Sequence, residues 1–214
     1  MSYTGPNETN YFAEIHPGDE LFDSMKRQKE KLFSIPGSQY VSDDPHFTII
    51  AARTADMNSL IDGLRWIFHW FSPFVYKIIG MEETMYPSGL VEARTVVHPG
   101  DIYKFKYVHF AAVETSRHHK SRTVMDRYIP STMNEKQREN LEYCGFPNAR
   151  DLFVPHASLG RFKPETLNEV RTLLEGYNPS GSYQAYKTII WRLPTVKEDP
   201  NERPEKLEEF LFGI

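Results

Sequence analysis

"PHFTII", residues 45–50, returns in nearly the same form as "PHASLG" at residues 155–160. Each copy runs proline, histidine, an apolar residue, a hydroxyl residue and an apolar residue, and a helix is predicted after each. Residues i and i+2 of a β-strand point to the same face. Each copy therefore predicts a strand that projects one imidazole and one hydroxyl together.

The histidine and hydroxyl pairs are His46 with Thr48 and His156 with Ser158. If the two strands lie close together about a pseudo-twofold axis, one central cleft receives two imidazoles and two hydroxyls. A neutral imidazole can accept a proton from an attacking oxygen while a protonated one donates to the leaving oxygen. The hydroxyls can donate hydrogen bonds to phosphate oxygens. These groups predict phosphodiester chemistry that needs no metal and no cofactor. A lone histidine on a strand is more often structural, and the matching second copy favours the functional interpretation.

The composition fits an ordinary globular protein that acts on a small ligand. The chain has 214 residues, 40% hydrophobic and 25% charged, with a formal net charge of −4. An acidic balance argues against a protein that coats duplex nucleic acid, but it leaves room for a small phosphate ligand. A single cysteine, Cys144, excludes an intramolecular disulfide and a cysteine-based zinc site. The N-terminus lacks an apolar stretch of signal-peptide length, and residues 66–80 are too short and too polar to span a bilayer. We expect a soluble, cytoplasmic protein with no membrane partner.

Local patterns predict an alternation of strands and helices without a linker that would separate two domains. Strands are expected at 10–15, 39–52, 74–86, 89–97, 104–114, 150–162 and 182–193. Helices are expected at 20–33, 56–71, 133–145 and 163–177, with a short helix near the C-terminus. Residues 115–132 are polar and basic and predict a loop or a partly ordered lid, with a solvated surface loop as the alternative. The fold class is therefore α+β, a single two-lobed domain over 1–214 with internal pseudo-symmetry.

This layout resembles the 2H phosphoesterase superfamily, the LigT-like or RNA 2′,5′-ligase and cyclic phosphodiesterase fold, whose signature is two His-x-(Thr/Ser) motifs. The resemblance covers about 10–193. It implies that each lobe is an antiparallel sheet with flanking helices around the central cleft. It also implies that His46 and His156 are the acid/base pair, with Thr48 and Ser158 holding the phosphate. Segment 98–135 is surplus to compact members of the family, and 194–214 forms a C-terminal tail.

The resemblance implies a metal-independent phosphodiesterase that cleaves a small nucleotide. Candidate substrates are 2′,3′-cyclic phosphates, 2′,5′-linked oligonucleotides and cyclic oligonucleotide signals. A nucleotide-binding module that does not hydrolyse its ligand and an RNA 2′,5′-ligase are the alternatives. The partner is then a small nucleotide or a short oligonucleotide, and the chain is expected to be a monomer.

Several further residues are candidates for substrate binding. Basic side chains of the lid at 115–130 are expected at the rim of the cleft. Arg161 could reach a phosphate, although strict alternation would turn it away from His156, and a surface salt bridge is the alternative. Aromatic rings could stack on a base, although burial in the core is the alternative for each. The candidates are Tyr11, Phe12, Tyr40, Trp191, Arg117, Lys120 and Arg161.

Overall fold

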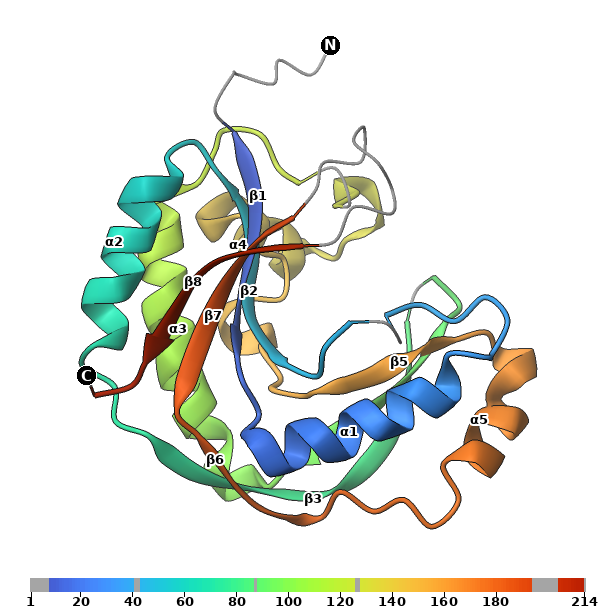
Figure 1. Ribbon diagram of the computed structural model, residues 1–214. Coiled ribbons are helices and arrows are strands. Elements are labelled where there is room, and N and C mark those ends of the chain that lie inside the picture. The colour runs from blue at the N-terminus through green and yellow to red at the C-terminus, as the bar shows by residue number, and fades with distance from the viewer. Residues whose placement is uncertain (1–7, 41–42, 87, 126–127, 194–203, 214) are drawn as a thin grey trace.

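Two four-stranded antiparallel sheets form the framework of the protein in a computed structural model (Figure 1), which describes residues 8–40, 43–86, 88–125, 128–193 and 204–213. The first sheet has the order β2-β1-β7-β8 and the second has the order β5-β4-β3-β6. The strands of the first sheet are β1 (Thr9–Ile15), β2 (Phe47–Thr54), β7 (Lys187–Leu193) and β8 (Glu205–Leu211). Those of the second are β3 (Phe74–Met85), β4 (Val91–Val97), β5 (Ser158–Phe162) and β6 (Gly181–Ala185). The predicted two-lobed α+β class is confirmed.

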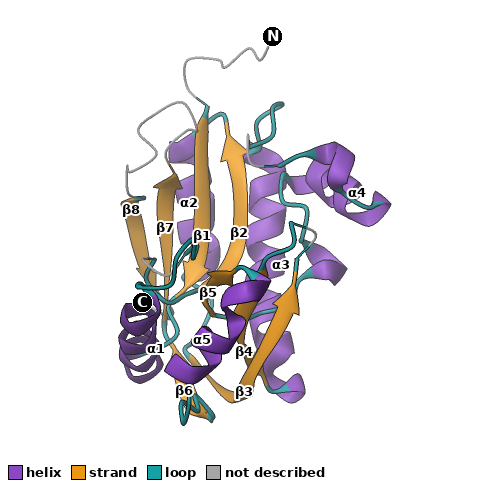
Figure 2. Ribbon diagram, turned by 90° about the vertical axis from the view of Figure 1, so that its right-hand side faces the viewer, coloured by secondary structure: helices purple, strands orange, loops and turns teal. Residues whose placement is uncertain are grey.

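The helices are divided between the two sheets (Figure 2). α2 and α3 pack together, and α3 also packs on β2, so both cover the first sheet. α1 follows β1 of the first sheet but crosses over and packs on β5 and α5, beside the second sheet. The bounds are α1 (Asp19–Leu32), α2 (Met57–Phe68), α3 (Ile102–His119), α4 (Glu135–Cys144) and α5 (Leu167–Leu173). Short 3-10 helices occupy Pro99–Asp101, Pro130–Thr132, Arg150–Leu152 and Pro164–Thr166.

Local sequence signals explain where the helices start and stop. Asp56 caps α2 by accepting a hydrogen bond from the backbone N–H of Ser59. Asn134 and Gln137 form a reciprocal capping box at the start of α4. α4 ends at Gly145, whose φ of 81° places it in the left-handed conformation that glycine adopts without strain.

The strand predicted at 104–114 is wrong, because these residues belong to α3. The pattern of Phe105, Val108, His109 and Ala112 matches the period of a helix, and all four side chains are buried. Alternation of polar and apolar residues over a shorter window hid this longer period. Within segment 98–135, which the resemblance implied to be surplus, Ile102–His119 are therefore a helix that packs into the core.

The C-terminal third also differs from the prediction. The single strand expected at 182–193 is two strands, β6 and β7, which lie in different sheets. The prediction of a short C-terminal helix is also wrong. These residues form β8, which pairs with β7, and the side chains of Phe210 and Phe212 are buried. The rest of the predicted tail, 194–203, lies outside the described residues. Among the helices that the structure describes, none has the length and apolar composition needed to cross a membrane.

Candidate active site

The two motifs meet where the two sheets join. Phe47 forms an isolated antiparallel bridge with Ala157, so the middle residues of the two motifs face each other directly. Both middle residues are buried. The motif residues on either side of them, His46, Thr48, His156 and Ser158, are half-buried, and the two imidazole side chains are 23% and 27% exposed. The alternation expected from the sequence is confirmed, and we call these four residues the histidine site.

Both motif strands carry a β-bulge one residue after the hydroxyl residue. The register of the β1–β2 ladder skips Ile49, and that of the β4–β5 ladder skips Leu159. Gly160, which follows the second bulge, has a φ of 152°. A bulge bends a strand and changes which way the following side chains point. The pseudo-symmetry of the sequence thus extends to the irregularities of the backbone.

The second bulge corrects the prediction for Arg161. Strict alternation would have turned this side chain away from His156. Because the bulge inserts one residue, Ser158 and Arg161 lie on the same face, and both contact the carboxylate of Glu92. Arg161 is therefore beside the histidine site.

Each imidazole is oriented by the backbone two residues before it. Nδ1 of His46 lies 2.7 Å from the carbonyl oxygen of Asp44, and Nδ1 of His156 lies 2.8 Å from that of Val154. A carbonyl oxygen only accepts hydrogen bonds, so Nδ1 carries the proton in both rings. The other nitrogen, Nε2, is then the atom available for proton transfer.

His46 lies in surroundings that favour its neutral form. Packing around the ring lowers the pKa of His46, and the charge of Lys29 adds to this effect. The carboxyl of Glu14 is 3.5 Å from Nδ1 and almost fully buried. Burial raises the pKa of Glu14 well above its ordinary value, so this carboxyl favours its neutral form too. Neither shift favours an ion pair between Glu14 and His46.

His156 lies beside a carboxylate that stays charged. Oε2 of Glu92 is 3.3 Å from Nε2 of His156, and Tyr86 donates a hydrogen bond of 2.8 Å to the same oxygen. Ser158 and Arg161 contact Oε1 at 3.1 and 3.3 Å. Burial alone would raise the pKa of Glu92, but the hydrogen bonds from His156 and Tyr86 and the charge of Arg161 hold it at about 2. This ionised carboxylate accepts a hydrogen bond from Nε2 of His156, while the carbonyl oxygen of Val154 accepts from Nδ1.

Aromatic side chains flank the site on both sides. Phe12 lies 5.3 Å from the ring of His46 and stacks on Trp191 at 6.1 Å. The guanidinium of Arg161 lies 4.9 Å from the ring of Tyr40 and 4.0 Å from that of Tyr86. Three of the four predicted rings are thus close to the motifs, and their role in stacking stays a prediction.

Tyr11 is the exception. It is 1% exposed, and its hydroxyl donates a hydrogen bond of 2.8 Å to Ser116 on α3. The prediction that Tyr11 binds substrate is wrong, because strand alternation directs it into the core while its neighbour Phe12 faces the histidine site.

Arg117 and Lys120 lie away from the histidine site. Lys120 pairs with Thr54 at the far end of β2, which is roughly 26 Å along the strand from His46. Arg117 is on α3 and contacts Glu114 and Tyr143. The prediction that these two residues line the rim of the cleft is wrong.

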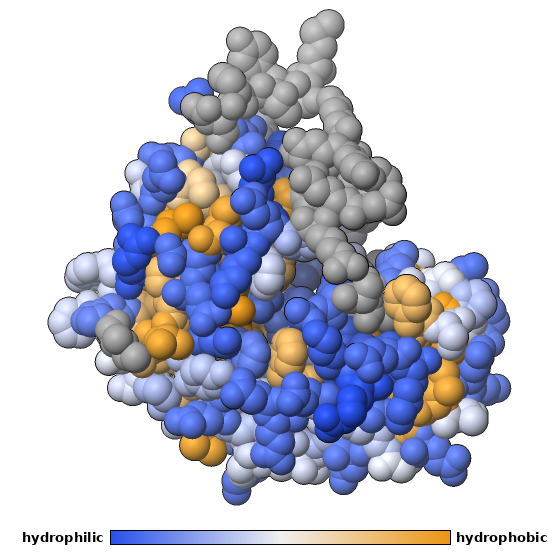
Figure 3. Space-filling model, in the orientation of Figure 1, coloured by the Kyte–Doolittle hydropathy of each residue, from blue (hydrophilic) through white to orange (hydrophobic). Residues whose placement is uncertain are grey.

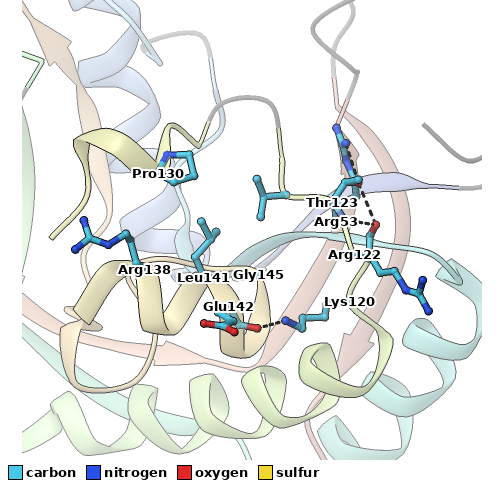
Figure 4. A pocket seen from close by; sticks show the side chains of 11 residues that line it. Arg53, Lys120, Arg122, Thr123, Pro130, Arg138, Leu141, Glu142 and Gly145 are labelled. Atoms are coloured by element: carbon cyan, nitrogen blue, oxygen red, sulfur yellow. Dashed lines mark hydrogen bonds between the residues drawn. The ribbon is translucent and has the colours of Figure 1, made fainter. Parts of the chain in front are cut away.

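A separate hollow of about 300 Å³ lies at that end of β2 (Figure 4). Its lining includes the cations Arg53, Lys120, Arg122 and Arg138. Several of these are already engaged: Lys120 donates to the backbone carbonyl of Glu142, and Arg138 donates to that of Met133. Of the lid expected at 115–130, residues 115–119 are the end of α3, residues 120–124 and Pro130 line this hollow, and 126–127 lie outside the described residues.

Sequence reasoning missed Glu14, Glu92, Tyr86 and Lys29. Each glutamate is the single acidic residue of its predicted strand, "NYFAEI" or "GLVEARTVV". A charged residue in a strand that is buried on both faces is unusual, and this was the available signal. In the part of the chain that the structure describes, no group of three or more histidine, cysteine, aspartate or glutamate residues is arranged to hold a metal ion.

Comparison with known proteins identifies the fold. No family model matches the chain, and no curated protein matches it in sequence. Among solved structures, TT0787 of Thermus thermophilus matches with a TM-score of 0.60 at 13% identity, over 95% of this chain and 98% of that one. E. coli LigT complexed with phosphate matches at 0.55 and 12% identity, and its complex with 3′-AMP at 0.53 and 12%, each over 96% of this chain and 98% of LigT. The expected resemblance is confirmed as a likeness of fold over nearly the whole of each chain.

Proposed function

Because the chain has the LigT-like fold and joins its two His-x-hydroxyl motifs at one site, we propose that it is a 2H phosphodiesterase acting on a small nucleotide. The observation that carries this proposal is the Phe47–Ala157 bridge, which brings both motifs together from opposite sheets. The complexes of E. coli LigT with phosphate and with 3′-AMP support a phosphate-bearing nucleotide as the ligand class. The nearby rings of Phe12, Trp191 and Tyr40 are suited to a base.

The unequal surroundings of the two histidines suggest their roles. His46, whose pKa is lowered by burial, is the general base, and His156, whose Nε2 lies beside the ionised carboxylate of Glu92, is the general acid. Nε2 of His46 takes a proton from water, whose oxygen forms the new bond to phosphorus. The bond from phosphorus to the leaving oxygen breaks, and Nε2–H of His156 supplies the proton to that oxygen. The two rings then exchange protons with solvent and return to their starting states.

The remaining groups bind the non-bridging phosphate oxygens. Thr48, Ser158 and Arg161 are hydrogen-bond donors on the faces that carry the histidines. In the free protein Ser158 and Arg161 contact Glu92. A bound phosphate would compete with that carboxylate for the same donors, and donors aimed at the developing charge stabilise a transition state.

The test is an activity panel in excess EDTA. Nucleoside 2′,3′-cyclic phosphates, 2′,5′-linked oligoadenylates, and cyclic di- and trinucleotides should include at least one substrate whose turnover is unaffected by the chelator. His46→Ala and His156→Ala should each lower kcat by about 10²- to 10⁴-fold with the fold intact by circular dichroism. Turnover abolished by EDTA would contradict the metal-free mechanism, and a double-alanine protein that still turns over substrate would contradict the roles of the histidines.

Two alternatives are separated by the fate of the ligand. A sequestering module would bind a nucleotide tightly in calorimetry and release it unchanged. An RNA 2′,5′-ligase would join strands over the same site, so product analysis with RNA ends as substrates distinguishes it from hydrolysis.

A further inference from the structure

Lys29 occupies a position on α1 where an apolar residue would be expected. The buried residues of this helix are Leu21, Met25, Lys29 and Leu32, which share one face. Lys29 is 3% exposed, while its neighbour Lys31 lies on the exposed polar surface of the same helix. Figure 3 shows the polar character of that outer surface. The basic side chains of α1 are therefore not all on its outer face, because Lys29 is buried.

The ammonium of Lys29 points at the second motif. Nζ donates a hydrogen bond of 3.0 Å to the backbone carbonyl of Ser158, the hydroxyl residue of that motif. Among the residues that the structure describes, no carboxylate lies within ion-pairing distance, 4.0 Å, of Nζ. A buried ammonium with one backbone hydrogen bond and no counter-ion is costly to fold.

Several charged groups act on Lys29 from nearby elements. Burial lowers the pKa of Lys29 to about 8, while Asp43, Asp44 and Glu92 act to raise it. Its charge in turn disfavours protonation of His46. Lys29 is thus electrically coupled to both sides of the histidine site.

We propose that Lys29 is the buried counter-charge of the substrate phosphate, so that an anion held between the two motifs balances the charge of Lys29 from beyond contact distance. This inference rests on the proposed function. It assigns Lys29 a positioning role, because a charge in a poorly solvated site stabilises an anion without touching it. The cost of burying the ammonium is then offset when the phosphate binds.

Sulfate is a suitable probe because its charge is constant from pH 6 to pH 9.5. We expect Lys29→Met to weaken sulfate binding in calorimetry by about 10-fold or more, as loss of a nearby charge predicts. Lys29→Arg should keep most of the affinity. The matched control Lys31→Met removes a charge from the same helix and should leave affinity unchanged. Lys29→Met should melt no lower than the parent, since it removes an uncompensated charge.

The pH dependence gives a second readout. Sulfate affinity of the parent should fall as pH rises through about 8, where Lys29 loses its proton, and Lys29→Arg should lack this fall. Any change in affinity that comes from the titration of His46 should be the same in the parent and in Lys29→Arg. If Lys29→Met binds sulfate as the parent does, or if it only loses stability, Lys29 is structural and the inference is overturned. Absence of sulfate binding by the parent would instead count against the phosphate site and thus against the proposed function.

Discussion

Two buried glutamates distinguish two histidines that look equivalent in the sequence. The carboxyl of Glu14, beside His46, favours the neutral form, whereas the carboxyl of Glu92, beside His156, stays ionised. Burial is the largest influence on both carboxyls. The pKa values differ because Glu92 accepts hydrogen bonds from Tyr86 and from residues of the second motif, while Glu14 accepts too few hydrogen bonds to offset its desolvation.

Glu92→Gln should lower kcat. The amide keeps the shape of the side chain but removes the negative charge that lies beside Nε2 of His156. A hydrogen bond to a charged group contributes about 1.5–3 kcal/mol, which corresponds to a loss of about 10- to 100-fold in kcat. Steady-state kinetics provides the measurement, with Glu83→Gln, an exposed glutamate paired with Arg171, as the control. An unchanged kcat would remove Glu92 from the mechanism.

The pH profile should show the lowered pKa of His46. The proposed base works only when it is neutral, and its pKa lies below the ordinary value of 6.5. On the acidic side of the profile, the midpoint of the decrease in kcat/KM should therefore lie below pH 6.5. A midpoint at or above pH 6.5 would show that another group is the base.

Glu14→Gln should make the protein more stable than the parent at high pH. The folded state holds a proton on Glu14 that the unfolded state releases above about pH 4.5, so the stability of the parent falls with increasing pH on account of this group. Glutamine removes that dependence. Denaturant unfolding at pH 4 and pH 8 should give nearly equal stabilities for parent and variant at pH 4 and a more stable variant at pH 8. A variant that is less stable at pH 8 would indicate that Glu14 is charged and paired in the folded state.

Among the elements, the two bulged strands β2 and β5 determine which side chains share the site. The bulge after Ser158 keeps Arg161 on the face of His156, and the equivalent bulge after Thr48 follows the first motif. α3 packs against β2 and contacts its bulge. Nδ1 of its buried His109 is 2.7 Å from the carbonyl oxygen of Ile49, the bulge residue of β2.

Gly160→Ala should reduce both stability and activity. Its φ of 152° is unfavourable for a residue with a Cβ, and such strain costs about 1–3 kcal/mol. Relief of the strain would shift Ser158 and Arg161. Gly80 provides the control, because it has a φ of 148° at the bulge of β3, and a Cβ there would meet nothing within 4 Å. Thermal melts should show a loss for both alanine variants, and kinetics should show a loss for Gly160→Ala alone. Equal activity of the two variants would contradict a role for the second bulge.

At the scale of the whole molecule, one hydrophobic core holds the two sheets together. Most of the buried hydrophobic side chains of both sheets belong to a single cluster. Phe212, just past β8 of the first sheet, stacks at 6.1 Å on Phe74 of β3 in the second sheet. The C-terminal strand therefore belongs to the junction between the lobes.

Phe212→Ala should destabilise the whole fold. Truncation of a buried phenylalanine costs about 3–5 kcal/mol, and this ring is 3% exposed. Leu211→Ala is the matched control, since Leu211 is 42% exposed and its truncation should cost much less. Denaturant unfolding followed by circular dichroism gives both values. A loss as small for Phe212→Ala as for Leu211→Ala would show that β8 is dispensable to the core.

The sequence by itself determined the two motifs and the side chains that they expose together. His46 with Thr48 and His156 with Ser158 could be predicted because strand alternation is local and repeats every two residues. The two-lobed α+β class followed from the order of strands and helices around that repeat.

Only the tertiary structure decided which other groups join the motifs. Three features depend on neighbours distant in sequence. They are the bulge that turns Arg161 towards the site, the crossing of α1 that brings Lys29 to Ser158, and the contacts that leave Glu14 neutral and Glu92 ionised. Local periodicity carries no information about such neighbours. The pKa of a buried group is set by its desolvation and by the donors around it, and these exist only once the sheets have come together.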